Sequence, residues 1–242
     1  MAQAKPAKMS RQARTKALTM RSVASGARTK LTILDAAEKL FARSGFDGTS
    51  IRDVAQAAGV PLALVSYHFK SKLGLYRAVF QRRLAEVGKI RITRVDQIRP
   101  SADRMELLRQ VSRALVEPII ALDTSPEGRD FARLIAREIN DPQEVERGII
   151  EEHFDPIAHN IIAKLRAAFP EVDKRSIYWS YLFAAGALAI NHVSVGRIER
   201  LSKGACRASE ASAILDNLVE FIAGGMRANF EKHVTTKSKK SR

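Results

Sequence analysis

The sequence predicts an all-α protein, and three observations lead to that prediction. Apolar residues recur at helical spacing from Arg28 almost to the end of the chain. No segment shows the sustained alternation of apolar and polar residues that a half-buried strand requires. Glycine, proline and helix-capping residues interrupt the helical pattern where one helix would end and the next begin. We therefore expect a series of nine helices.

The first three expected helices follow one another closely along the chain. Helix one carries an apolar face and ends at Gly45, helix two covers about 50–58, and helix three covers about 61–69. The apolar face of helix one is formed by Ile33, Ala37, Leu40 and Phe41.

Residues 49–69 have the pattern of a helix-turn-helix. The apolar positions that two short crossed helices bury against each other are Val54, Ala58, Val60 and Val65. Ala55 lies where the helices approach most closely, and Gly59 lies in the turn, where a positive φ costs glycine little. Ser50 and Asp53 have the spacing of an N-cap with a capping box. An αα-corner that serves stability alone is the alternative interpretation.

Six longer helices are expected after the helix-turn-helix. Ser101 is the expected cap of the second of them, Pro118 should bend or end it, and Pro156 should kink the fourth. Residues 123–128 are expected to form a turn. The expected ranges are 71–98, 102–122, 128–140, 142–169, 173–195 and 208–230.

Composition excludes several classes of protein. Of the 242 residues 45% are hydrophobic, which is enough for one large or two small cores. A single cysteine, Cys206, cannot form an internal disulfide and fits a reducing compartment. The longest apolar run, 182–190, is far shorter than the roughly 20 residues that span a bilayer. We therefore expect a cytoplasmic protein.

The net charge of +15 lies mainly at the two ends. Residues 1–27 hold six Lys or Arg and no acidic residue, and residues 231–242 hold five against one glutamate. We expect both ends to be flexible and disordered, and to add salt-dependent attraction to DNA. An organelle-targeting peptide is the alternative for the N-terminal arm.

Residues 33–80 resemble a known family. The segment ILDAAEKLFARSGFDGTSIRDVAQAAGVPLALVSYHFKSKLGLYRAVF is similar to the N-terminal domain of TetR-family bacterial transcriptional regulators. VSYHF and the later FIAGGMRA resemble a branch that answers to fatty acids or their thioesters. The resemblance implies a homodimer, a palindromic operator, a DNA-binding domain over 28–75 and an effector-binding and dimerisation domain over 76–230. It implies nucleoid association when DNA is bound.

The resemblance also implies which residues contact DNA. Arg52 matches a residue that reaches guanine or phosphate. Ser66 stands where the family usually has Tyr, with the ring shifted to Tyr67, and Leu62 offers no hydrogen bond, so we expect sparse base readout. The full expected set is Thr49, Ser50, Arg52, Pro61, Leu62, Ala63, Ser66, Tyr67, His68, Lys70 and Lys72. For Tyr67 the alternative is a place in the small core, and for Lys70 a solvated surface charge.

The expected effector is small and largely apolar. Its pocket is expected among the helices over 102–195, with walls chosen from Phe131, Leu134, Phe154, Trp179, Phe183, Asn191 and His192. Each of these has an ordinary core position as its alternative. Small residues in 184–189 and 223–225 favour dimerisation through the last two long helices.

Other functions have weaker support in the sequence. His153, Asp155 and His159 lie close together, but no third or fourth metal ligand accompanies the helical pair Asp155 and His159. No nucleophile elbow or phosphate loop is present. We therefore expect neither an enzyme nor a metal or cofactor site. A ligand-independent architectural DNA binder and a transcriptional activator remain alternatives to a repressor.

Overall fold

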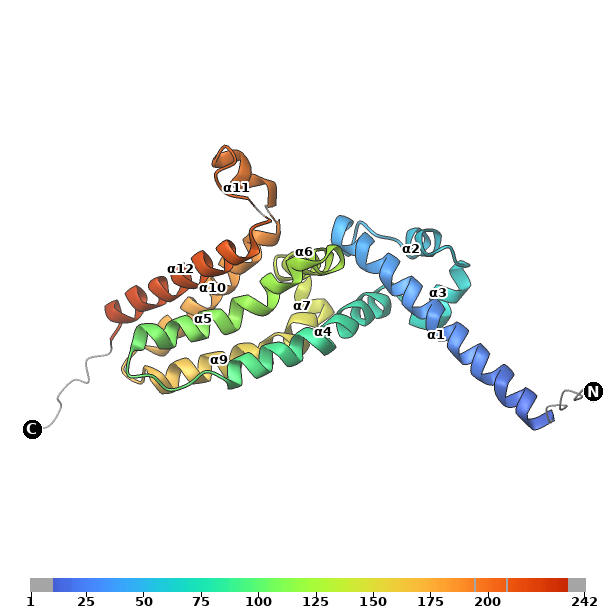
Figure 1. The fold of residues 1–242 in the computed structure, drawn as a ribbon, viewed down its shortest axis with the longest axis horizontal. Helices are drawn as coiled ribbons and strands as arrows, with labels where there is room; N and C mark the ends of the chain where they lie inside the picture. The colour runs from blue at the N-terminus through green and yellow to red at the C-terminus, as the bar shows by residue number, and fades with distance from the viewer. Residues whose placement is uncertain (1–10, 194, 208, 235–242) are drawn as a thin grey trace, which may run out of the picture.

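The structure, a computed structural model, describes residues 11–193, 195–207 and 209–234. Within these ranges every regular element is a helix, and the sole extended pairing is an isolated bridge between Val172 and Val234. The all-α prediction is confirmed. Figure 1 shows an elongated molecule with α1–α3 at one end and a larger bundle at the other. None of the described helices is both long enough and apolar enough to cross a membrane.

Helices α1 (Arg11–Ser44), α2 (Ile51–Ala58) and α3 (Leu62–Phe69) form a small domain, which we call the head. Its core is built from apolar residues that the helical period places on facing sides. They include Ile33, Ala37, Phe41, Val54, Val65 and Phe69, all buried. The structure thus contains the three helices expected over this region.

The basic N-terminal arm differs from expectation. We predicted a disordered segment over 1–27, but α1 begins at Arg11, so residues 11–27 continue the helix. The composition explains this, because the segment holds four Ala and three Arg, which favour helix, and contains one glycine and no proline. Residues 1–10 lie outside the described part of the chain.

Helix α4 (Lys72–Asp96) leaves the head and enters the bundle. Ser71 caps it, its hydroxyl accepting a hydrogen bond from the backbone N–H of Gly74 at 3.0 Å. One face of α4 is buried along its whole length, by Leu75, Tyr76, Val79, Phe80, Leu84, Val87 and Val95. The helix therefore belongs to the cores of both parts.

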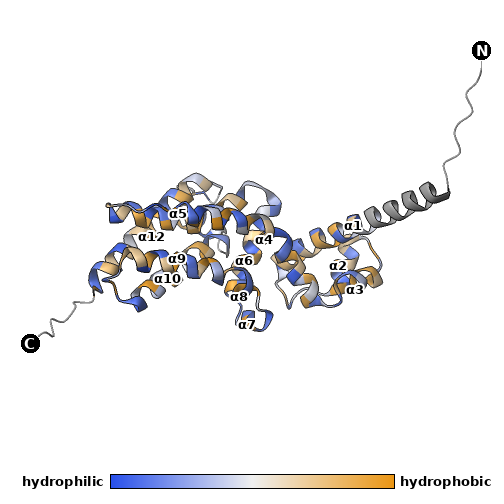
Figure 2. Ribbon diagram, turned by 90° about the horizontal axis from the view of Figure 1, so that it is seen from below, coloured by the Kyte–Doolittle hydropathy of each residue, from blue (hydrophilic) through white to orange (hydrophobic). Residues whose placement is uncertain are grey.

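The bundle, which we call the body, contains α4 and all later helices. These are α5 (Arg104–Ile120), the 3₁₀ turn η1 (Ala121–Thr124), α6 (Pro126–Ile139), α7 (Glu144–Arg147), α8 (Ile149–His153), α9 (Asp155–Ala168), α10 (Lys174–Val193), α11 (Val195–Leu201) and α12 (Ala211–Lys232). Figure 1 shows α12 running along α5 and α10, with α11 projecting from the bundle. Figure 2 shows apolar residues gathered between these helices.

Several boundaries in the body correct the sequence predictions. Asp103, not Ser101, caps α5, and Pro118 lies inside α5, which ends two residues later. The single helix expected over 142–169 is divided at Gly148, which has a left-handed φ of 63°, into α7 and α8. A second break, between α8 and α9 at Phe154, lies beside Pro156, where a kink was predicted. Helix α11 was not predicted. Of the expected C-terminal tail, Glu231 and Lys232 end α12, and 235–242 lie outside the described residues.

A buried carboxylate on α1 connects the head to α4. Glu38 is buried, and both its oxygens accept hydrogen bonds from Arg83 at 2.7–3.0 Å. Arg82 donates to Glu38 at 2.6 Å and to Asp35 at 2.6 Å. Burial of a carboxylate is costly unless cations and donors surround it. This cluster therefore fixes the position of α1 on α4.

A second buried carboxylate connects α4 to α6. The hydroxyl of Tyr76 donates to Glu138 at 2.8 Å, and Arg147 donates to both oxygens of Glu138 at 3.0 Å. Arg147 also forms an ion pair with Asp141 at 2.9 Å, and its carbonyl accepts hydrogen bonds from Arg77. Burial and the charge of Glu138 raise the pKa of Tyr76 above its usual value, so the hydroxyl remains a donor.

We predict that Glu138→Gln lowers the free energy of unfolding by about 3 kcal/mol, because it removes the main partner of a buried guanidinium. Chemical denaturation monitored by circular dichroism measures the change. The control is Glu146→Gln, which removes an exposed carboxylate on α7. It should shift the free energy of unfolding by less than about 0.5 kcal/mol. Equal stability of the two variants would contradict the assigned role of Glu138.

Candidate nucleic-acid interface

The turn between α2 and α3 has the local geometry that the sequence predicted. The hydroxyl of Ser50 accepts from the backbone N–H of Asp53 at 3.1 Å, and Asp53 accepts from the backbone N–H of Ser50 at 3.0 Å. These bonds complete the capping box. The Ser50 hydroxyl, which donates to the Asp53 carboxylate at 2.7 Å, and the Ser50 N–H hold the pKa of Asp53 below its usual value. Gly59 ends α2 in the left-handed conformation at φ 65°. The orientation of α3 is set by this pair of local interactions.

One face of α3 is buried and the other is exposed. Val65 and Phe69 point into the head core. The exposed face carries Leu62, Ala63, Ser66 and Tyr67, preceded by exposed Pro61. Tyr67 is 70% exposed, which excludes the alternative that its ring closes the small core. Four of the five expected DNA-contacting residues on α3 are therefore exposed, and the fifth, His68, is half-buried.

Basic residues flank the exposed face of α3. Arg52 on α2 is exposed. Lys70 ends α3 at a positive φ of 65°, with its ammonium 5.5 Å from the centre of the Tyr67 ring. Lys72 lies 4.4 Å from the centre of the Phe46 ring and donates to the carbonyl of Asp47 at 3.4 Å. His68 is half-buried beside Tyr67. The arrangement surrounds an apolar and hydroxyl-bearing strip with positive charge.

Thr49 corrects one prediction. We expected its hydroxyl to contact the DNA backbone, but the residue is 3% exposed and donates its proton to the carbonyl of Gly45 at 2.9 Å. This bond satisfies a carbonyl at the end of α1. Thr49 is therefore a structural residue of the α1–α2 turn. Ser50 remains exposed, although its hydroxyl also donates to Asp53 at 2.7 Å.

Two family models match the chain, and they fall on the two parts of the structure. Residues 33–79 match the model for bacterial regulatory proteins of the tetR family, and residues 113–225 match a tetracyclin repressor-like C-terminal domain. The chain belongs to the TetR family. It is accordingly a transcriptional regulator with a helix-turn-helix, and the family consists of DNA-binding regulators, not enzymes.

Curated relatives agree with this assignment over the N-terminal part. The HTH-type regulator YttP of Bacillus subtilis is 35% identical over 83 residues, which cover 34% of this chain and 40% of YttP. AcrR of Shigella flexneri is 28% identical over 92 residues, 38% of this chain and 42% of AcrR. The matched part thus spans less than half the length of either relative.

Solved structures share the fold over most of the chain. The fatty acid degradation regulator FadR of Bacillus halodurans has a TM-score of 0.54 at 16% identity and covers 82% of this chain and 96% of its own. FadR of Bacillus subtilis, solved in complex with stearoyl-CoA, has a TM-score of 0.50 at 16% identity and covers 78% and 97%.

The body of this TetR-family chain does not bring the expected effector residues together. Phe131, Leu134 and Phe154 are buried among other core side chains. Trp179 and Phe183 lie on α10 with 52% and 65% of their surface exposed, and their rings stack at 5.8 Å. Asn191, expected as an orienting group, donates to the carbonyl of Ala187 in its own helix at 2.9 Å. None of these six residues lines the large cleft of the body.

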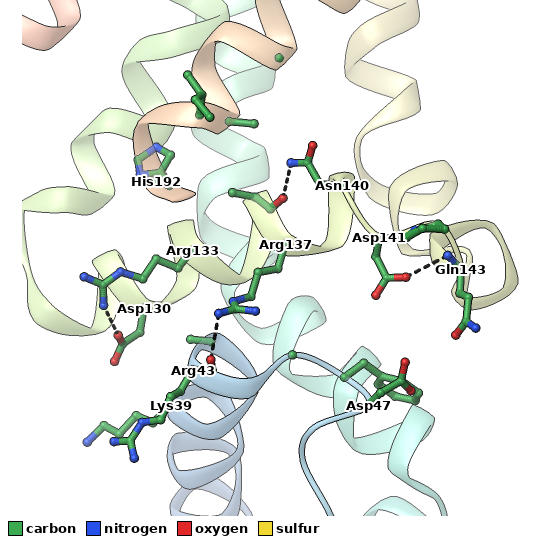
Figure 3. Close-up of a pocket in the computed structure, with 18 of the residues that line it drawn as sticks. Lys39, Arg43, Asp47, Asp130, Arg133, Arg137, Asn140, Asp141, Gln143 and His192 are labelled. Carbon is green, nitrogen blue, oxygen red and sulfur yellow. Dashed lines mark hydrogen bonds and ion pairs between the residues drawn. The ribbon is translucent and has the colours of Figure 1, made fainter. Parts of the chain in front are cut away.

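A cleft of about 1400 Å³ lies elsewhere, between α1, α6 and the α10–α11 end of the body. Of the expected effector residues, His192 alone lines it. Figure 3 shows basic side chains of α1 and α6 around the cleft, with Arg137 donating to the carbonyl of Arg43. The cationic lining residues are Lys39, Arg43, Arg133, Arg137, Arg197 and Arg200. The cleft is basic and open, not the apolar cavity that was expected.

The sequence analysis missed Arg91. This residue is buried in the body, on α4. A signal was present, since Arg91 interrupts an otherwise apolar row formed by Leu84, Val87, Val95 and Ile98 at helical spacing.

The histidines and aspartate considered as metal ligands form no metal cluster. Among the described residues no group of three or more His, Cys, Asp or Glu side chains is placed to hold an ion. His159 is exposed, and His153 lies 3.6 Å from its neighbour Glu152.

We predict that Gly59→Ala lowers the free energy of unfolding by about 1 kcal/mol, because a Cβ disfavours the left-handed backbone. A Cβ there would meet no atom within 4 Å, so the effect is conformational and not steric. The control is Gly88→Ala within α4, where a Cβ also meets nothing within 4 Å but φ is helical; it should raise stability by up to about 1 kcal/mol. Thermal unfolding measures the stability of both variants relative to the wild type. A stabilising effect of Gly59→Ala would contradict the prediction.

Proposed function

We propose that this TetR-family protein is a repressor that binds a palindromic operator as a homodimer and is released by a small, largely apolar effector. The observation that carries the proposal is the exposed face of α3, which has basic residues on both sides. Such a helix fits the major groove, with its basic neighbours on the phosphates. The protein would act on DNA in the cytoplasm.

In this proposal each of the expected DNA-contacting residues except Thr49 has a role in DNA binding. Leu62, Ala63 and Ser66 meet base edges, where an apolar side chain can contact a thymine methyl. Arg52 supplies the main hydrogen-bonding contact to a base or phosphate. The remaining residues, Ser50, Pro61, Tyr67, His68, Lys70 and Lys72, meet the sugar-phosphate backbone. Affinity should therefore fall steeply with salt.

The exposed apolar surface of the last two long helices supports dimerisation. The exposed large side chains there are Tyr178, Trp179, Leu182, Phe183, Ile190 and Phe221. An apolar patch of this kind marks an association surface. A Cβ at Gly186, Gly224 or Gly225 would meet no atom within 4 Å in the protomer, so the missing side chains leave room for helices of a second copy.

Release by the effector requires a link between body and head, and α4 supplies one. It carries Ser71 and Lys72 beside α3 and the partners of Glu38 and Glu138 further along. A coupling free energy of about 1–3 kcal/mol between effector and operator lowers operator affinity roughly 5- to 150-fold. Activation of transcription is the alternative outcome of the same binding.

A ligand-independent architectural protein is the second candidate function. It would carry basic residues over its whole surface, whereas residues 28–230 hold 30 basic and 25 acidic residues. Footprinting on long DNA separates the two functions. Protection confined to one or two sites supports a regulator, and uniform coverage supports the architectural alternative.

We predict that Arg52→Ala abolishes specific operator binding and leaves dimerisation intact, because it removes the principal hydrogen-bonding group beside α3. Binding is measured on sites selected from random-sequence duplexes by the wild-type protein. The control, Arg166→Ala, removes the same charge from an exposed position on α9 and should leave the preference unchanged. A sequence preference retained by Arg52→Ala would refute the role of Arg52.

We predict that Phe221→Arg converts the dimer to a monomer, since it places a charge within the apolar surface of α10 and α12. Sedimentation velocity over a range of concentrations measures the change. Phe221 is 71% exposed and the control residue Val145 on α7 is 75% exposed, so neither substitution disturbs the core. Val145→Arg should remain dimeric. A wild-type protein that is monomeric at every concentration would overturn the dimer.

A further inference from the structure

Arg91 occupies an unusual place in the body. It lies on α4 in the middle of the apolar row that faces the bundle, between Val87 and Val95, and only 3% of its surface is exposed. Burial lowers the pKa of its guanidinium. Arginine nevertheless keeps its proton in proteins, so this position holds a positive charge within the core.

The immediate surroundings of Arg91 are aromatic. Its guanidinium carbon lies 5.1 Å from the centre of the Phe154 ring, at the junction of α8 and α9. The half-buried phenol of Tyr181 on α10 also faces Arg91, but burial raises its pKa, so it is uncharged and does not neutralise the guanidinium. The negative charge of Asp155 raises the pKa of Tyr181, but no ion pair joins Asp155 to Arg91. Three elements, α4, the α8–α9 junction and α10, thus meet around this side chain.

Two of the three nitrogen atoms of the Arg91 guanidinium have no hydrogen-bond partner among the described residues. Nε and Nη1 are both buried and have no partner there. The other buried arginine, Arg147, differs, since it forms ion pairs with Glu138 and Asp141. An isolated buried charge costs several kcal/mol. A guanidinium that is buried at this cost and has no anion beside it in the protein is suited to bind an anion from outside.

We propose that Arg91 binds the carboxylate of an organic acid whose apolar part packs against Phe154 and Tyr181, inside the body. The proposal deepens the proposed function and rests on it, because it names the chemical class of the effector. It also changes the expected location of the effector. Of the predicted wall residues, the proposed site keeps Phe154 and uses none of the others.

The surroundings favour a monoanion. A single guanidinium can neutralise one negative charge, whereas a phosphate group would carry about one further charge into an apolar interior. Aromatic and aliphatic neighbours fit a hydrocarbon or aromatic ring attached to the carboxylate. Polyanions have a better match in the open basic cleft between α1 and α6, which is a separate surface.

The position of Arg91 explains how such a ligand acts on DNA binding. Arg91 is nineteen residues from Lys72 along one helix, about 29 Å at 1.5 Å per residue. Arg82 and Arg83, which hold α1 through Glu38, lie between them. A ligand that pulls on the Arg91 end of α4 therefore displaces a rigid element that carries the head.

The test compares wild-type protein with Arg91→Met, a variant of similar length without charge. Thermal unfolding is recorded without additive and with millimolar acetate, benzoate, decanoate or uncharged decanol. Arg94→Met is the matched control, because Arg94 lies about one turn further on α4, is exposed, and forms an ion pair with the half-buried Glu117 at 3.2 Å. Arg91→Lys, which keeps the charge, is the second variant.

Two results are expected. Arg91→Met alone should raise the unfolding temperature by about 2–8 °C without additive, because a buried unpaired charge disappears. Benzoate or decanoate, but not decanol, should stabilise the wild type and Arg94→Met, and bind at least about 30-fold more weakly to Arg91→Met. Arg91→Lys should retain part of the response.

Two results would overturn the proposal. The first is a lower unfolding temperature of Arg91→Met without additive, which would make the guanidinium a structural group with an internal partner. The second is stabilisation by carboxylates that is absent in the wild type or equal in wild type and Arg91→Met. Operator binding is measured separately, so loss of the proposed DNA function would not be confused with loss of the carboxylate site.

Discussion

Two buried carboxylates position α4, and the rest of the molecule depends on that helix. Glu38 of α1 pairs with Arg82 and Arg83 of α4, and Glu138 of α6 accepts from Tyr76 of α4 while pairing with Arg147. A buried carboxylate without these partners would be strongly destabilising, so the contacts are obligatory and directional. The head is consequently held on the body by specific ion pairs and not by apolar packing alone. Any displacement of α4 is transmitted to α1.

Three parts of the molecule are separated from one another: the exposed face of α3, the buried Arg91 on α4, and the apolar surface of α10 and α12. The exposed face of α3 lies next to the start of α4, and the buried Arg91 lies near its other end. The apolar surface of α10 and α12 is on the body, away from the head (Figure 1). The proposed sites for DNA binding, ligand binding and association therefore consist of different side chains, and in the proposal a change at one site reaches another through the positions of the helices.

The head could be predicted from sequence because its determinants are local. The capping box of Ser50 and Asp53, the left-handed Gly59 and the apolar spacing of α2 and α3 each depend on residues within one or two turns. Thr49 was the exception, since its exposure depended on how the end of α1 folds over it. The body was harder, because breaks at Gly148 and Phe154 divide a continuous apolar pattern into short helices, and because α11 is only seven residues long.

The amino-acid sequence alone determined the helical class and the helix-turn-helix, since these follow from period, caps and turn residues. It also indicated the family, through the resemblance of residues 33–80. Tertiary structure alone decided which apolar residues are covered: Phe131 is buried and Phe183 is exposed, although both lie on helices with similar spacing. It also decided that Arg91 has no internal anion while Arg147 has two. The physical reason is that burial and charge pairing depend on which distant helix packs against a face, and helical period does not encode that choice.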